Sequence, residues 1–405
     1  MRRFLARTIL TLIILITLGA RLLGRFLDLF RTDTQGPYRV AMIGTFYNVG
    51  WLVAHATPLV RCEDVDEVLV VCDEPLSLEL DGLIYTCPTR AARERYGRSL
   101  ARVLKLIEIS YRFRPKVYIG YHIMPNGPLA RIMASIFGGA AIYQMTGGPV
   151  QVAGGGPGSE NPLLAATESP SVVMEGLMFS LVRSFDTVIV RGHSALDYVR
   201  SKQLAQSAEV VTGAIDVDVF RPGTHEKETD VLYVARLIPG KGHKRMVDVI
   251  AACHARLPEI RVHLAGDGDL DAELRQYAGE KGVADNFVFL GKTTEIPAWL
   301  QRTRCWVLLS DTEGMSIALL EAMGAGVPCL VTDVGDLRDA VRDGETGVLV
   351  NLNDDPAVIA NRLVELLTDE GVMSRLGENA RNLIRDEYSM EATAERWHRI
   401  FRSYE

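Results

Sequence analysis

The sequence predicts an α/β protein of two domains, each built on a parallel sheet with helices on both faces. Its 405 residues exceed the length of one ordinary domain and fit two. Short apolar runs typical of buried strands alternate with helical stretches, first over residues 39–190 and again over 231–350. Hydrophobic residues make up 48% of the chain, which suits parallel strands that are buried on both faces.

The first series of strands begins with an apolar run at 39–43 that ends at Gly44. A strand followed directly by glycine is how dinucleotide-binding domains open, so Gly44 is a candidate ligand-binding residue. Further strands are expected at 68–72, 117–120, 140–145 and 187–190. These elements predict a first Rossmann-like domain over residues 36–215.

The second series predicts another Rossmann-like domain, over residues 216–387. Its strands are expected at 231–234, 261–265, 288–290, 306–309, 328–332 and 347–350. Thr212–Pro222, which contains two aspartates and ends in Phe-Arg-Pro, is the candidate junction between the domains. The last part, residues 388–405, is expected to form a separate helix over 389–404.

Residues 1–35 contain an uncharged apolar stretch, Thr8–Ala20, between arginines. A single membrane-spanning helix, a helix lying in the membrane plane and a cleaved signal peptide all fit this pattern. The stretch is short for a span unless Arg7 and Arg21 extend their charged ends to the interface. We favour the single span, and arginines on both sides leave its orientation open.

Charge and cysteine content argue against a nucleic-acid-binding protein and against a metal site built from cysteines. A net charge of −7 does not favour nucleic acid as the main partner. The six cysteines are scattered through strand-like runs, and none forms a close pair with metal-ligand spacing. We therefore expect reduced thiols in a cytosolic compartment and no bound metal.

The most informative segment is 308–328, LLSDTEGMSIALLEAMGAGVP. It predicts a strand, a turn containing Glu313, and a helix that opens at Gly314. Glu321 follows eight residues later and is expected near the same helical face as Glu313. Free N–H groups at a helix start bind phosphate, and carboxylates accept hydrogen bonds from sugar hydroxyls. The segment thus predicts a nucleotide-sugar site, although a capped helix with a surface Glu313 and a structural Glu321 is the alternative.

A second segment, YVARLIPGKG at 233–242, places Arg236 and Lys241 directly after a predicted strand. Ligands of α/β proteins bind at this carboxyl edge of the sheet. Two fixed cations there can hold negative charge without a metal. Either residue alone would more simply be a solvated surface charge.

Together, these segments resemble the signatures of the retaining glycosyltransferases with two Rossmann-like domains, the GT-B fold of family 4. The resemblance is specific over 212–350, loose over 36–200 and absent from 1–35. It implies that Arg236 and Lys241 contact the donor phosphates, that Glu313 contacts the transferred sugar and that Glu321 binds the ribose hydroxyls. It also assigns donor-binding backbone N–H groups to Gly314, Met315 and Ser316.

The resemblance assigns further donor-binding positions. It implies a loop beside the nucleotide at Gly266 and Gly268, a base-binding segment at Gly291 and Lys292, and a histidine near the donor sugar at His122. A hydrogen-bonded structural histidine is the alternative for His122. The chain departs from the family where Asp336 follows Gly335 instead of a second glycine, and where glycines follow Thr146 instead of a histidine.

We therefore expect a membrane-attached glycosyltransferase that is retaining, needs no metal or other cofactor, and uses a nucleoside diphosphate sugar. Its expected acceptor is a saccharide or a lipid-linked saccharide. Nucleotide-sugars are cytosolic in bacteria, so the catalytic domains should face the cytoplasm. The resemblance also implies that helix 388–405 crosses back to the first domain. An epimerase or phosphorylase on the same fold and a catalytically silent nucleotide-sugar-binding subunit are the alternatives.

Overall fold

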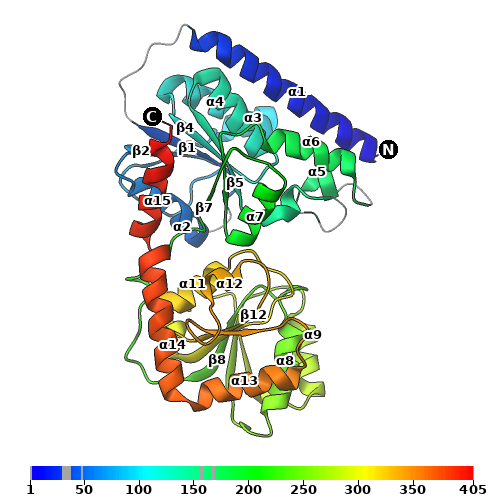
Figure 1. Ribbon diagram of the computed structural model, residues 1–405, viewed down its shortest axis with the longest axis vertical. Helices are drawn as coiled ribbons and strands as arrows, with labels where there is room; N and C mark the ends of the chain where they lie inside the picture. Colours follow the sequence, from blue (N-terminus) through cyan, green and yellow to red (C-terminus); the bar gives the residue numbers. More distant parts are fainter. Residues whose placement is uncertain are drawn as a thin grey trace. The chain divides into compact units, whose positions relative to one another are not determined.

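The computed structural model describes residues 2–29, 38–46, 49–154, 159, 161–165 and 169–404. The chain divides into two compact units (Figure 1). The first comprises Met1–Ala214 together with Thr393–Glu405, and the second comprises Ile215–Ala392. The expected boundary between residues 35 and 36 lies outside the described part of the chain.

The first unit contains a seven-stranded parallel sheet in the order β3-β2-β1-β4-β5-β6-β7. The strands are β1 (Arg39–Ile43), β2 (Glu67–Val71), β3 (Leu83–Tyr85), β4 (Val117–Tyr121), β5 (Ala140–Met145), β6 (Thr187–Val190) and β7 (Ser207–Val210). The five predicted strands are present. The sequence analysis missed β3 and β7, because three and four residues at the sheet edges carry no continuous apolar run.

Helices cover both faces of this sheet. They are α1 (Arg2–Asp28), α2 (Val49–Val60), α3 (Arg90–Phe113), α4 (Asn126–Phe137), α5 (Pro162–Ala165), α6 (Val172–Val182) and α7 (His193–Ser201). Strand β1 shows the two faces: Val40 and Met42 join one apolar cluster, and Ala41 and Ile43 join the other. Successive side chains of a strand point to opposite faces, so a fully apolar strand identifies a sheet covered on both sides.

The second unit contains a six-stranded parallel sheet in the order β10-β9-β8-β11-β12-β13. The strands are β8 (Thr229–Val234), β9 (Val262–Ala265), β10 (Phe287–Gly291), β11 (Thr303–Leu308), β12 (Cys329–Thr332) and β13 (Val348–Val350). The helices are α8 (His243–Cys253), α9 (Asp271–Glu280), α10 (Ile296–Arg302), α11 (Ile317–Gly324), α12 (Leu337–Ala340), α13 (Pro356–Thr368) and α14 (Glu370–Leu383). All six predicted strands are present, with ends that shift by up to three residues.

Helix α1 is long and apolar enough to cross a membrane, by length and composition. It also packs lengthwise against α4 and α6 of the first unit (Figure 1). The packed face buries Ala6, Leu10, Thr17, Ala20 and Gly24. A Cβ atom at Gly24 would lie 2.1 Å from the carbonyl oxygen of Ser135, so glycine lets the two helices approach closely.

The last helix, α15 (Met390–Arg402), carries the chain end that belongs to the first unit. Its Trp397 and Phe401 join the apolar cluster on the Val40 face of the sheet. The Nδ1 atom of His398 lies 2.5 Å from Oδ2 of Asp64, and its Nε2 atom lies 3.2 Å from Oε1 of Glu63. Apolar burial and these polar contacts fix the chain end to the first unit.

Candidate active site

The loops that follow β8 and β11 meet at the carboxyl edge of the second sheet, where the two strands pair. Tyr233, the fifth residue of β8, is fully buried and joins them. Its hydroxyl donates to the carbonyl oxygen of Lys241 at 2.6 Å and accepts from the backbone N–H of Leu309 at 2.9 Å. This hydroxyl therefore holds the Lys241 loop against the end of β11.

Lys241 and Glu313, which were predicted to contact the donor, lie together. The Nζ atom of Lys241 is 2.6 Å from Oε1 of Glu313, and the Ser310 hydroxyl donates to the same oxygen at 2.8 Å. The side chains are only 23% and 11% exposed. The backbone of Ser310 is held in turn by the Thr332 hydroxyl, which donates to its carbonyl oxygen at 2.7 Å. Glu313 is thus an oriented carboxylate beside a fixed cation.

Two glycines allow the backbone to approach these residues closely. Gly242 has φ +68°, and a Cβ atom there would lie 1.8 Å from the carbonyl oxygen of Leu309. Gly335 has φ +56°, and its Cβ atom would lie 1.7 Å from the carbonyl oxygen of Glu313. Neither position accommodates another residue without moving the backbone. Gly335 therefore supports the Glu313 turn even though Asp336 replaces a family glycine.

The glycine loop after β9 lies against the loop that carries Arg236. The backbone N–H of Leu237 donates to the carbonyl oxygen of Asp267 at 2.7 Å, and that of Gly266 donates to Gly291 at 2.9 Å. The predicted segments at 236–241, 266–268 and 291–292 are therefore neighbours. Arg236 and Lys292 are exposed, and their charged groups bond to none of the residues that the structure describes. They remain available to a ligand.

Helix α11 begins at Ile317, so the prediction that it opens at Gly314 is wrong. Ser316 takes the N-cap position, and its hydroxyl accepts from the backbone N–H of Leu319 at 3.3 Å. Because Glu313 precedes the helix, it does not share a helical face with Glu321. Within the described chain, the N–H groups of residues 314–316 form no hydrogen bond. These three donors next to Glu313 form a suitable site for an anion.

Glu321 lies in the second turn of α11, and its carboxyl group has no hydrogen-bond partner among the described residues. Burial raises the pKa of Glu321 from 4.5 to about 7. An enclosed carboxyl group without a partner is costly in the folded protein unless a ligand supplies hydrogen-bond donors. This observation favours ligand binding over a structural role for Glu321.

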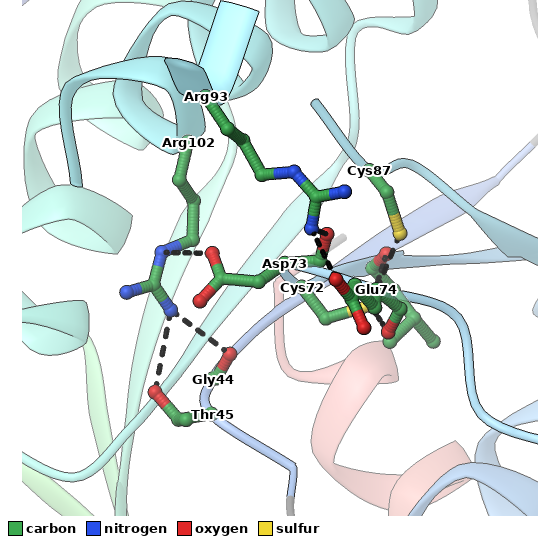
Figure 2. Close-up of polar contacts among 9 residues, drawn as sticks. Gly44, Thr45, Cys72, Asp73, Glu74, Cys87, Arg93 and Arg102 are labelled. Carbon is green, nitrogen blue, oxygen red and sulfur yellow. Dashed lines mark hydrogen bonds and ion pairs between the residues drawn. The ribbon is translucent and has the colours of Figure 1, made fainter. Parts of the chain in front are cut away.

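The two remaining predicted residues, His122 and Gly44, belong to the first unit. His122 follows β4 with φ +61°, and its Nδ1 atom lies 2.8 Å from the Thr146 hydroxyl and 2.9 Å from Nε2 of Gln151. An amide nitrogen donates, so Nδ1 accepts and the neutral ring carries its proton on Nε2. Gly44 directly follows β1, and its carbonyl oxygen accepts from Nη1 of Arg102 at 3.3 Å (Figure 2).

Sequence reasoning missed several residues that organise the site. Tyr233 and Ser310 position Lys241 and Glu313, and Gln151 sets the tautomer of His122. Arg245 donates to the carbonyl oxygen of Leu309 at 2.6 Å and pairs with Asp311 at 3.0 Å. Tyr233 and Ser310 could have been identified from their positions, because they lie at the carboxyl ends of β8 and β11, where ligands of α/β proteins bind.

Comparisons with known proteins agree with this site. Residues 215–383 match the model of the family "Glycosyl transferases group 1". N-acetyl-alpha-D-glucosaminyl L-malate synthase of Bacillus anthracis is 29% identical over 181 residues, which cover 44% of this chain and 46% of that protein. A Mycobacterium tuberculosis enzyme, GDP-mannose-dependent alpha-(1-6)-phosphatidylinositol monomannoside mannosyltransferase, is 27% identical over 47% of this chain and 54% of its own length. The chain thus spans about half the length of the curated relatives it matches.

Solved structures extend the likeness to both units. Anabaena HepE, solved in complex with UDP-glucose, matches with a TM-score of 0.69 and 15% identity, over 90% of this chain and 99% of HepE. At this identity the likeness concerns the fold, which is the GT-B fold of two Rossmann-like units. The family match over residues 215–383 lies within the second unit, which is therefore similar in sequence to the group 1 glycosyltransferases.

Proposed function

We propose that this protein is a retaining, metal-independent glycosyltransferase that takes a sugar from a nucleoside diphosphate sugar. The observation that carries the proposal is the set of unsatisfied groups in the second unit. Arg236 and the N–H groups of residues 314–316 are available to phosphate, and the enclosed Glu321 is available to hydroxyl donors. A nucleoside diphosphate sugar supplies both kinds of partner.

Donor binding is proposed to open the Lys241–Glu313 ion pair. Lys241 would turn to the diphosphate beside Arg236, and Glu313 would then accept hydrogen bonds from the sugar hydroxyls. As the bond between the anomeric carbon and the phosphate oxygen breaks, the two cations and the helix-start N–H groups stabilise the charge on the leaving diphosphate. They act on the leaving group in the role that a divalent metal has in other transferases.

Retention is proposed to follow from attack on the face that the leaving group vacates. The acceptor oxygen forms its bond to the anomeric carbon, and its proton passes to the leaving phosphate oxygen. No separate base is then needed. Because Gln151 and Thr146 occupy Nδ1 of His122, that ring nitrogen is not available to take a proton from the acceptor.

The proposed acceptor is a saccharide held at a membrane, approached from the cytoplasmic side. The M. tuberculosis relative is named for a phosphatidylinositol-linked acceptor. In this chain, one face of α1 is covered by α4 and α6, while Leu12, Leu15 and Leu22 are more than half exposed. Arg7 and Arg25 lie about five helical turns apart on one edge. Although the sequence alone favours a single span, this arrangement favours a helix that lies in the membrane interface.

The test is ligand-induced thermal stabilisation by UDP, GDP, ADP and their common sugars, with magnesium or with EDTA. A ligand at one hundred times its Kd stabilises the folded state by about 2.7 kcal/mol. We expect one nucleoside diphosphate sugar to stabilise the protein equally in both buffers, and Lys241→Ala to lose the effect. Stabilisation that requires magnesium would contradict metal independence. Binding without sugar transfer to any acceptor would support a silent binding subunit instead.

A further inference from the structure

Helix α3 carries a second exposed apolar stripe, which belongs to the same unit as α1. Leu100, Leu104, Ile107 and Tyr111 are between 40% and 71% exposed. Their spacing of four, three and four residues places them on one side of the helix. The helix contains seven basic residues and two acidic ones. An apolar stripe on a basic helix fits the surface of an anionic membrane.

A cavity of about 230 Å³ lies between these two helices, and α4 forms its floor. Its apolar lining includes Ile13, Ile16, Val103, Pro128, Leu129 and Ile132. Ile16 belongs to the exposed face of α1, and Val103 is next to Leu104 of the α3 stripe. The cavity is therefore continuous with the two surfaces that are suited to face lipid.

Among the residues that the structure describes, one charged residue, Arg102, lines the cavity, and its guanidinium is already engaged. Nη1 donates to the carbonyl oxygen of Gly44 and to the hydroxyl of Thr45, both at 3.3 Å. Nε lies 3.6 Å from Oδ1 of Asp73 (Figure 2). With this charge neutralised, the cavity offers apolar surface to a ligand. The bonds to Gly44 and Thr45 also connect it to the carboxyl end of β1, the edge of the sheet where α/β ligands bind.

We infer that this cavity binds the hydrocarbon chain of a lipid-linked saccharide acceptor. The chain enters from the membrane between α1 and α3 and packs on α4, while its saccharide extends toward the Gly44 end of the sheet. Burial of methylene groups against Val103, Leu129 and Ile132 supplies the affinity. The inference deepens the proposed transferase function and rests on it for the identity of the acceptor.

The experiment is photo-crosslinking of the full chain bound to anionic vesicles. One probe is a dodecyl glucoside with a diazirine at the chain end, and the other is a phosphatidylcholine with a diazirine in one acyl chain. Peptide mapping should find the glucoside probe on the lining residues of α3 and α4, and the phosphatidylcholine probe on the exposed stripe at Leu100 and Leu104. Lining residues labelled equally by both probes would show that ordinary membrane lipid occupies the cavity and would overturn the proposal. Absence of labelling there would also overturn it.

Val103→Phe places a ring in the cavity, and Leu104→Phe, one residue along, adds the same group on the membrane side. If the ring displaces two methylene groups of the probe, labelling of the lining should fall about fifteenfold, because each buried methylene group changes the binding affinity roughly fourfold. Leu104→Phe should leave it unchanged, and Leu129→Phe gives a second filled variant from α4. Equal labelling of filled and control variants would refute the site. Donor stabilisation, measured in parallel, tests the transferase function separately and should be the same in all variants.

Discussion

Replacing Glu321 by glutamine should stabilise the ligand-free protein in a pH-dependent way. The pKa of Glu321 is about 7 in the folded protein, because burial disfavours the carboxylate, and near 4.5 when the chain is unfolded. Between these values the folded state holds a proton that the unfolded state has lost. The stability contribution is therefore fully present below pH 4.5 and is lost as the pH rises to 7. The shift is worth about 3 kcal/mol.

Glutamine does not titrate, so Glu321→Gln should escape this loss. The assay compares the unfolding free energy of variant and wild type in urea at pH 5 and at pH 8. The variant should gain about 2.5 kcal/mol relative to wild type between the two values, because the wild type has already lost part of the contribution at pH 5. Glu365→Gln, on the exposed face of α13, is the matched control and should show no such gain. A difference between Glu321→Gln and wild type that does not change with pH would refute the reasoning.

The same substitution should weaken donor binding, because an amide accepts hydrogen bonds from ribose hydroxyls less strongly than a carboxylate does. For the wild type, donor affinity should fall by up to about tenfold for each pH unit below 7, as the neutral acid replaces the carboxylate. Isothermal titration at pH 8 and pH 6 measures both effects. If the variant is more stable but its donor affinity is unchanged, Glu321 does not bind the donor and its role is structural.

Three further predictions follow from the geometry. Gly335→Ala should destabilise the protein by at least about 2 kcal/mol, whereas Gly314→Ala, with open space around its Cβ position, should stay within about 0.5 kcal/mol in thermal unfolding. Replacing Leu15 and Leu22, which are 60% and 68% exposed, by serine should reduce sedimentation with anionic vesicles about 30- to 150-fold, without loss of fold. His398→Ala should raise hydrogen exchange across α15, because the bond to Asp64 is lost; unchanged protection would show that apolar packing alone holds this helix.

Local patterns in the sequence predicted the sheets well. Strands β1, β5 and β6 have the expected bounds, because continuous apolar runs beside glycine or helical segments admit few other structures. The start of α11 was predicted at Gly314, which was wrong, because the Ser316 hydroxyl caps the helix two residues later. Helix boundaries depend on such single hydrogen bonds, which periodicity does not register.

Site residues could be predicted where their charge and their spacing in a motif identified them. Residues that act through hydrogen bonds to distant parts of the backbone could not. Lys241 and Glu313 could each be assigned to the donor site from their motifs, but the role of Tyr233 depends on a hydroxyl that joins residues 76 positions apart. The docking of α1 was also beyond prediction. Apolar residues such as Ala6, Leu10 and Leu15 lie on several sides of this helix, so its sequence does not reveal that Ala6 and Leu10 are buried while Leu15 faces outward.

The contact between Lys241 and Glu313 has a consequence for how the proposed enzyme selects its donor. The ammonium and the carboxylate already neutralise each other, so the pair acts as an internal competitor for any incoming ion. A free phosphate can bind Lys241 only by breaking its ion pair with Glu313, which leaves the Glu313 carboxylate with the Ser310 hydroxyl as its partner among the described residues. A sugar nucleotide satisfies both halves at once, because its phosphate replaces the carboxylate and its hydroxyls replace the ammonium. Discrimination against partial ligands is thereby built into the resting state.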